Sequence, residues 1–258
     1  MNFNTHCGLR LGDNLAHVHF ARKMAAKYPE HVFTHAAHLA YLNQLLELTW
    51  DLPNLRLIPF EYRSADSIDV WKNAGGYWEN HKLKYNYGRF YIEFFEMIAA
   101  KMGLESPLKR PPDLLFDYPA IKKPANICEP FDCLVVNSAP QSNQWLAYNE
   151  KEMESMVEVL ARKNSVITTA KTSLRVPCTG DCKPPLSVTA IGTLSLYCKY
   201  IVMVATGPSW PTFNVWNTES IKRRIILNGT EDVNIAPNTV TVRTCGEALK
   251  MCEMEGII

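Results

Sequence analysis

The sequence has no long hydrophobic run: no apolar stretch in its 258 residues approaches the roughly 18–20 residues that span a bilayer. It also lacks a basic segment followed by an apolar one near its start, so no secretory signal is visible. These two absences argue against a membrane-spanning helix and favour a cytoplasmic location.

An excess of charge of either sign is missing as well. The 27 Lys and Arg residues against 26 Asp and Glu residues leave a net charge of +1. A global field that would steer nucleic acid to the protein is therefore not expected, whereas a local basic patch and a nucleic-acid acceptor are not excluded.

Metal-binding patterns are scarce, although the chain has eight cysteines. Cys178 and Cys182 lack the second Cys or His pair that a structural zinc site needs nearby. His31, His35 and His38 have a helical, metal-like spacing, but the segment from His31 to His35 is typical of a strand, which would scatter them. We therefore expect no metal, no cofactor, and reduced, buried thiols.

Apolar residues, in contrast, are plentiful: they make up 47% of the chain, as in a well-packed globular protein. Strand-like and helix-like segments alternate in both halves. The expected strands are residues 1–7, 31–35, 54–60, 131–139, 165–170, 200–205 and, as the last, 223–229. The expected helices are residues 14–27, 36–50, 89–103, 149–164, 187–199 and 245–255, and one more that begins after Thr206. Asn149 is the expected N-cap of the helix over residues 149–164. This order predicts an α/β protein of two Rossmann-like domains, whose parallel sheets face each other across a cleft.

Two segments interrupt the alternation. Residues 61–91 are rich in Tyr and Trp and predict an insertion, which either fills a small satellite core or stacks on rings of a substrate. Six prolines from Pro107 to Pro130 predict a linker between domains. We therefore expect an N-terminal domain over residues 1–125 and a C-terminal domain over residues 126–258.

Three loops follow expected strands, at the sheet edge where such folds bind ligands. They span Gly8–Asp13, Asn137–Trp145 and Ala205–Trp210. Glycine lets backbone approach a phosphate or sugar closely, and hydroxyl and amide side chains supply neutral donors. The side chains and glycines of interest are Gly8, Gly12, Ser138, Gln141, Ser142, Thr206, Gly207 and Ser209.

Three blocks of sequence resemble one family, in the right order. "GLRLGDNLAHVHFARKMA" is similar to the N-terminal loop and helix of the heptosyltransferase-like glycosyltransferases, which have the two-domain GT-B fold. "VVNSAPQSNQWLAYNEKEMESMVEVLARK" resembles the family's first C-terminal strand, loop and helix. "LSVTAIGTLSLYCKYIVMVATGPSWPTFNVW" resembles its donor stretch, where an Asp-Thr-Gly-Pro turn opens a helix toward the nucleotide sugar.

The resemblance implies an inverting, metal-independent glycosyltransferase that moves a sugar from a nucleotide-sugar donor to a glycan or other hydroxyl acceptor. It implies Asp13 as the base on the acceptor hydroxyl; read from the sequence alone, Asp13 is as well suited to be an N-cap of the helix that follows. On the acceptor side we expect contacts from Arg10, Asn14 and His35. His35, at the end of an expected strand, is placed either to touch the substrate or to cap a loop. The residues implied at the donor are Gly12, Ser138, Gln141, Ser142, Lys171, Thr206, Gly207 and Ser209.

The sequence departs from the family at three donor-site positions. Asn143 stands where the family has a Lys two residues before a Trp, Ala205 stands where it has the Asp before Thr-Gly-Pro, and the expected acidic residue of the preceding helix falls near Ala190. Lys171 or Lys183 is a candidate to replace the lost positive charge. These losses favour a second hypothesis, a non-catalytic descendant that binds a nucleotide or glycan. A third hypothesis, a different nucleotide-using enzyme on a doubly wound fold, rests on fold analogy alone.

Overall fold

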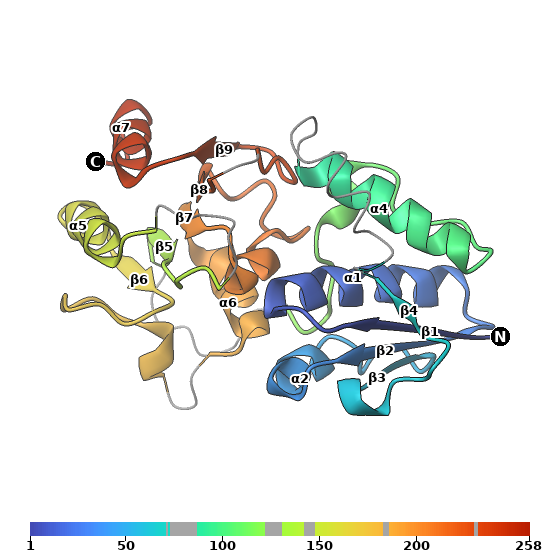
Figure 1. Cartoon of the computed structure of the whole chain (residues 1–258). Helices are drawn as coiled ribbons and strands as arrows, with labels where there is room; N and C mark the ends of the chain where they lie inside the picture. Colours follow the sequence, from blue (N-terminus) through green and yellow to red (C-terminus); the bar gives the residue numbers. More distant parts are fainter. Residues whose placement is uncertain (71, 73–86, 122–130, 142–147, 183–185, 230–231) are drawn as a thin grey trace. The chain divides into compact units, whose positions relative to one another are not determined.

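The chain divides into two compact units, unit 1 (Met1–Ala120) and unit 2 (Ile121–Ile258) (Figure 1). The structure is a computed structural model, and it describes residues 1–70, 72, 87–121, 131–141, 148–182, 186–229 and 232–258. The expected domain boundary after residue 125 lies outside the described residues.

Unit 1 has a parallel sheet with the strand order β3-β2-β1-β4. Its strands are β1 (Asn2–Cys7), β2 (Val32–Ala37), β3 (Leu55–Pro59) and β4 (Ile68–Asp69). The chain moves outward from β1 to β3 and then returns to the other side of β1. The switch in direction therefore lies between β1 and β4, which is where open parallel sheets bind ligands.

The helices of unit 1 form a layer on the sheet. They are α1 (Leu11–Lys27), α2 (Leu39–Leu46) and α4 (Tyr87–Lys101), with the 3-10 turns η1 (Phe60–Tyr62) and η2 (Pro111–Leu114). Figure 1 shows α1 between the sheet and α4. The ring of Phe20 on α1 stacks on that of Phe95 on α4 with 4.7 Å between centroids, and both side chains are buried. The apolar area removed from water on both sides of α1 is what stabilises this layer.

The predicted insertion over residues 61–91 is wrong in part. Ile68 and Asp69 form β4, which pairs in parallel with β1 and so belongs to the sheet. At the other end of the segment, Tyr87 and Tyr91 lie on α4 and are buried in the core of unit 1. Most of the aromatic segment, residues 71 and 73–86, lies outside the described residues.

Unit 2 has a five-stranded parallel sheet with the order β6-β5-β7-β8-β9. Its strands are β5 (Cys133–Val136), β6 (Val166–Thr168), β7 (Tyr200–Val204), β8 (Arg223–Leu227) and β9 (Thr239–Val242). The expectation that residues 223–229 form the last strand is wrong, because β9 pairs in parallel with β8 beyond it. The switch point of this sheet lies between β5 and β7.

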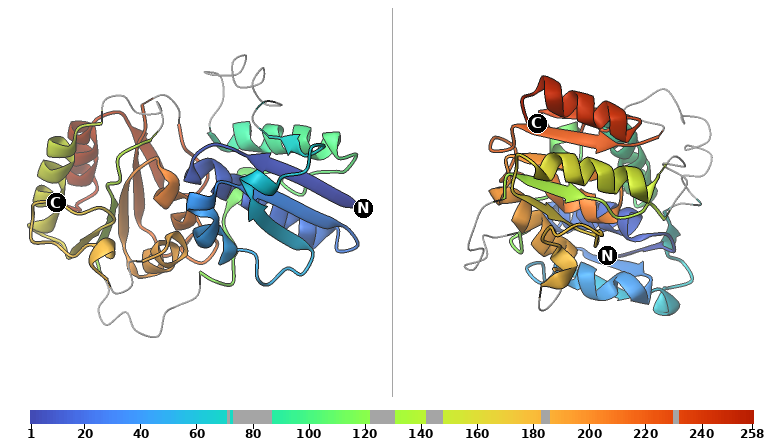
Figure 2. Two further views of the ribbon diagram at one scale, coloured as in Figure 1. Left: turned by 60° about the horizontal axis from the view of Figure 1, so that its bottom comes forward. Right: turned by 90° about the vertical axis from the view of Figure 1, so that its left-hand side faces the viewer.

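Helices cover both faces of the sheet of unit 2, as the left view of Figure 2 shows. The elements are α5 (Glu150–Ala161), α6 (Val188–Leu194), α7 (Cys245–Met254) and the 3-10 helices η3 (Thr179–Asp181), η4 (Ser195–Tyr197) and η5 (Gly207–Thr212). Helices α5 and α7 bury Met153, Val157 and Ala248 in one core with the strands, and α6 packs with η5 on the other face. The two-sheet parallel α/β fold predicted from the sequence is thereby confirmed.

Two sequence predictions about helix ends have different outcomes. Asn149 is the N-cap of α5, since its Oδ1 accepts from the N–H groups of Lys151 at 3.0 Å and Glu152 at 3.3 Å. The helix expected after Thr206 forms only as the short 3-10 helix η5, which contains Pro211. Proline removes a backbone donor and clashes with the preceding turn, so it disfavours an α-helix there.

Within the part of the chain that the structure describes, no helix combines the length and apolar character needed to cross a bilayer. Among the described residues of unit 2, six cysteines form no disulfide, and all of them except Cys182 are buried: Cys133, Cys178, Cys182, Cys198, Cys245 and Cys252. Burial raises the pKa of the Cys198 thiol to about 12, so it stays protonated at neutral pH.

Candidate functional site

The start of α1 carries the carboxylate that the sequence analysis singled out. Arg10, not Asp13, is the N-cap, and Asp13 is the third residue of the helix. The Oδ2 atom of Asp13 accepts a hydrogen bond from the backbone N–H of Arg10 at 3.2 Å. The N-cap interpretation of Asp13 is therefore wrong by three positions, although the carboxylate still stabilises the helix start as the acid of a capping box.

Asp13 is half-buried, and desolvation raises its pKa to about 6 in spite of the hydrogen bond from Arg10. A carboxylate with a pKa near the working pH is a good proton acceptor. Gly12 precedes it inside the first turn of α1 rather than in the loop. Arg10 is exposed at the same end of the helix.

Asn14 and His35, the other acceptor-side residues expected from the sequence, have no exposed surface. The Nδ2 atom of Asn14 donates to the carbonyl groups of Leu9 at 3.2 Å and Arg10 at 3.0 Å. The Nε2 atom of His35 lies 3.3 Å from Oδ1 of Asn14 and its Nδ1 lies 3.0 Å from Oγ1 of Thr5. The prediction that either side chain contacts an acceptor directly is therefore wrong. Asn14 holds the Leu9–Arg10 backbone in place, and His35 in turn holds Asn14.

Burial lowers the pKa of His35 to about 3, so the imidazole is neutral in this network. The three histidines with metal-like spacing are scattered, as expected for a strand. His31 precedes β2, His35 lies on it, and His38 is the N-cap of α2, with its Nδ1 accepting from the N–H of Ala40 at 3.3 Å. No group of three or more His, Cys, Asp or Glu side chains that could hold a metal occurs among the described residues.

In unit 2 the loop after β5 is tied to the loop after β6. The amide of Asn137 donates through Nδ2 to the carbonyl of Ala170 at 3.0 Å and accepts through Oδ1 from the N–H of Ala170 at 2.8 Å. The hydroxyl groups of Ser138 and Thr169 lie 3.3 Å apart. Gln141 is exposed, and Ser142 lies outside the described residues, as do Asn143 and Lys183.

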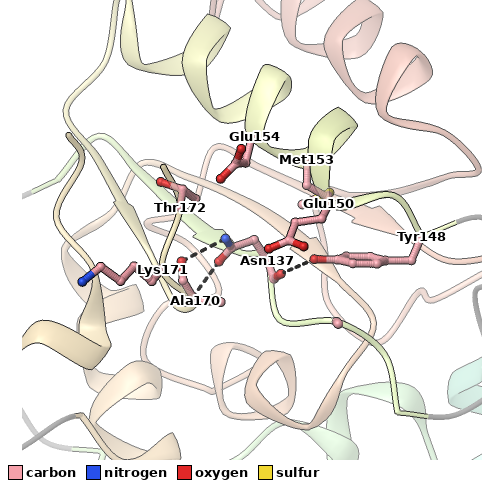
Figure 3. A pocket seen from close by; sticks show the side chains of 9 residues that line it. Asn137, Tyr148, Glu150, Met153, Glu154, Ala170, Lys171 and Thr172 are labelled. Atoms are coloured by element: carbon pink, nitrogen blue, oxygen red, sulfur yellow. Dashed lines mark hydrogen bonds between the residues drawn. The ribbon is translucent and has the colours of Figure 1, made fainter. Parts of the chain in front are cut away.

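A pocket of about 150 Å³ opens where these loops meet the start of α5. Its lining is drawn in Figure 3 and consists of Asn137, Ala139, Tyr148, Glu150, Met153, Glu154, Ala170, Lys171 and Thr172. The hydroxyl of Tyr148 donates to the carbonyl of Asn137 at 3.0 Å, and Glu150 lies beside it. Two carboxylates, from Glu150 and Glu154, make this pocket unfavourable for a diphosphate.

Lys171, a donor-binding candidate, extends away from Glu150 in Figure 3. Its Nζ lies 3.9 Å from Oδ1 of Asp181, and 81% of its side chain is exposed. The sequence analysis missed Tyr148 and Glu150. The signal for them was available, because they flank the N-cap Asn149 directly after the loop that follows β5.

The loop after β7 lies beside the loop after β5, because Val136 and Met203 are register partners on adjacent strands. Ser209 is buried, and its hydroxyl is used within the turn: it donates to the carbonyl of Thr206 at 2.7 Å and accepts from the N–H of Thr206 at 3.2 Å. The prediction that the Ser209 hydroxyl contacts a ligand is therefore wrong. The hydroxyl instead caps the start of η5. Thr206 and Gly207 are half-buried at the strand end.

Helix α6 approaches η5 closely enough to require a glycine. A Cβ atom at Gly192 would lie 2.8 Å from Cβ and 2.9 Å from the carbonyl oxygen of Pro211. Behind η5, the fully buried guanidinium of Arg224 donates through one Nη atom to Oδ1 of Asn217 at 2.6 Å and through the other to the carbonyl of Pro237 at 3.1 Å. The segment that begins at Thr206 is thus held on a rigid base.

Comparison with known proteins shows what this chain is similar to. No protein-family model and no curated protein matches the sequence. Among solved structures, E. coli heptosyltransferase WaaC with ADP-2-deoxy-2-fluoro heptose aligns over 98% of this chain and 99% of its own, with a TM-score of 0.57 and 11% identity. The E. coli ADP-heptose lps heptosyltransferase II aligns over 98% of both chains (TM-score 0.55, 11% identity). A glycosyl transferase family 9 protein from Veillonella parvula aligns over 100% of this chain and 90% of its own (TM-score 0.52, 9% identity). The chain therefore has the fold of these heptosyltransferases.

Proposed function

We propose that the protein is a glycosyltransferase, which moves a sugar from a nucleotide-sugar donor to an acceptor hydroxyl by an inverting, metal-independent displacement. The observation that carries this proposal is the fold likeness to heptosyltransferase structures over nearly the whole chain. One of those structures has ADP-2-deoxy-2-fluoro heptose bound. That likeness supports a nucleotide-sugar donor as part of the proposal.

The edge of the unit 2 sheet is the proposed donor side. Ser138 and Thr206 follow the two strands that flank the switch point, and Gly207 lets backbone approach the diphosphate. Backbone N–H groups and hydroxyl groups at this edge would stabilise the leaving diphosphate. Gln141, Ser142 and Lys171 stay donor-binding predictions from the sequence.

Asp13 is the proposed base, with Arg10 beside the acceptor and Gly12 toward the donor. In the reaction the acceptor oxygen forms a bond to the anomeric carbon while the bond from that carbon to the donor phosphate breaks. The acceptor proton passes to the Asp13 carboxylate, whose raised pKa suits it to this step. The proposal requires the edges of the two units to meet around both substrates. That arrangement, the choice of acceptor and the cytoplasmic location stay predictions from the sequence.

Binding without transfer is the second candidate. Ala205 stands where the resembling family has an aspartate, and the rim residues Glu150 and Glu154 bring negative rather than positive charge near the loop after β5. A protein that kept the fold but lost donor-site charges would bind a nucleotide or glycan more weakly and would not turn it over.

A two-step experiment separates the candidates. First, thermal unfolding is measured with a panel of nucleotide sugars and the free nucleotides. Any ligand that stabilises the protein is then tested for release of nucleoside diphosphate, with and without hydroxyl acceptors. Stabilisation with release supports the transferase, and stabilisation without release supports the binder. If no nucleotide sugar and no nucleotide stabilises the protein at millimolar concentration, both candidates are wrong.

A further inference from the structure

A second set of reactive side chains lies on the sheet of unit 1, separate from Asp13. His6 on β1 and Asp69 on β4 are register partners on adjacent strands. The imidazole Nδ1 of His6 lies 2.7 Å from Oγ of Ser67, and its Nε2 lies 3.4 Å from Oδ2 of Asp69. A serine, a histidine and an aspartate are thus in line, in the order that activates a serine hydroxyl.

The imidazole is held by its neighbours on several sides. The ring of Phe60 meets that of His6 edge-on, with 5.4 Å between centroids. Asp69 is fixed in turn, since its Oδ1 accepts from the backbone N–H of Lys72 at 3.0 Å. His6 is 9% exposed, whereas Ser67 is half-buried. Ser67 is therefore the end of the row that a molecule from solvent reaches.

Burial, more than the charges around it, keeps the imidazole of His6 neutral. Burial lowers the pKa of His6 below its usual value, Asp69 opposes this, and the cations Arg63 and Lys72 add to the lowering. Behind the strand, His35 is neutral as well. A neutral imidazole that carries its proton on Nε2, toward Asp69, leaves the Nδ1 lone pair to accept the proton of Ser67.

We propose that Ser67 is an activated nucleophile that accepts an acyl group from an ester, with His6 as its base and Asp69 orienting the imidazole. Oγ of Ser67 bonds to the carbonyl carbon, and the Ser67 proton passes to Nδ1 of His6. The ester C–O bond then breaks, and the leaving alcohol takes the proton from His6. Water resolves the acyl-serine by the same route and gives a carboxylic acid. This activity is independent of sugar transfer.

The test uses a fluorophosphonate probe on the intact protein, followed by mass spectrometry of the labelled peptides. Oγ of the serine bonds to phosphorus, the P–F bond breaks, and fluoride leaves. Ser64 is an internal control in the same segment: it is exposed, and its hydroxyl donates to the carboxylate of Asp66 rather than to a histidine. We expect Ser67 to be labelled at least tenfold faster than Ser64, as base assistance typically contributes 10² or more.

Substitutions test whether Ser67, His6 and Asp69 together cause the fast labelling. S67A should abolish the fast label, H6Q and D69N should slow it at least about tenfold, and S64A should leave it unchanged, with folding of each variant checked by thermal unfolding. The rate should fall as the pH is lowered through the pKa of His6, which burial places below its usual value, because His6 must be neutral to accept the serine proton. Equal labelling of Ser67 and Ser64, or an unchanged rate in folded D69N, would overturn the proposal.

Discussion

The backbone N–H of Arg10 donates to Oδ2 of Asp13 at 3.2 Å, so the proposed base is also part of the first turn of α1. The two roles use the carboxylate differently. A capping interaction needs only an acceptor oxygen, whereas proton transfer needs a group that gains a proton. Substitutions that keep one property and remove the other can therefore separate them.

Replacing Asp13 by Asn should keep the fold and remove the base. The amide oxygen can still accept from Arg10 and carries no charge to desolvate, so at neutral pH the variant should be at least as stable as the wild type and keep its donor affinity. The transfer rate should fall by roughly 10²–10⁴, the usual loss for a general base. D13A is the matched control for the helix start, and it should lose about 1 kcal/mol of unfolding free energy. Equal transfer rates for wild type and D13N would remove Asp13 from the mechanism.

The pH dependence of kcat/KM should show the same group. The folded-state pKa of Asp13 is raised to about 6, so the carboxylate forms only as the pH rises through that value. Transfer should therefore increase between about pH 5 and pH 7 and then level off. For stability the sign is opposite: folding favours protonated Asp13, and this contribution is present below pH 4 and is lost as the pH rises toward 6. If the pH profile of kcat/KM for D13N kept the same inflection, the titrating group would be a residue other than Asp13.

Gly207 tests the donor edge. G207V adds a branched side chain at the first residue of η5, where the diphosphate is proposed to approach, and it should weaken nucleotide-diphosphate binding at least tenfold. S209A is the matched control, because the Ser209 hydroxyl donates to the carbonyl of Thr206 within the turn. The variant should lose about 0.5–2 kcal/mol of unfolding free energy, and its folded molecules should bind the nucleotide as tightly as the wild type. Calorimetric titration gives both affinities. Unchanged binding in G207V would place the donor elsewhere.

Gly192 and Gly246 form a matched pair for packing. G192A would put a methyl group 2.8 Å from Cβ of Pro211, and it should cost about 1–3 kcal/mol of unfolding free energy. In G246A the closest atom to the new methyl group is Oγ1 of Thr244 at 3.9 Å, so the variant should be neutral or slightly more stable. Chemical denaturation measures both. A G192A variant as stable as G246A would show that α6 and η5 separate at little cost.

Much of the fold was predictable because apolar periodicity carries it. Local sequence signals predict helix α1, the parallel strands β1, β2, β5 and β7, and the N-cap at Asn149. The sequence analysis missed strands β4 and β9. β4 has only two residues, too few to show a period. β9 reads Thr-Val-Thr-Val, an alternation of β-branched residues that is typical of a strand and was overlooked because it is only four residues long.

The candidate site was predictable only as a set of loops. The sequence places Asp13 after the first strand, but it cannot show that α1 begins at Leu11, which makes Asp13 the third residue of the helix. It also cannot show that the Ser209 hydroxyl is engaged by Thr206, or that Asn14 and His35 are enclosed. Each of these depends on which groups surround a side chain in three dimensions, and adjacent sequence does not record that.

If a nucleotide-sugar donor binds at this edge as proposed, the glycine contact between α6 and η5 has a consequence for donor selectivity. Since the chain of α6 meets Pro211 with no side chain between them, the two elements cannot slide past one another without a steric clash. The start of η5 would then act as a fixed wall, and a donor with a bulkier sugar would have to be admitted by movement of the loop after β5. Variation in that loop, rather than in η5, would be the route by which a protein with this fold changes the sugar it accepts.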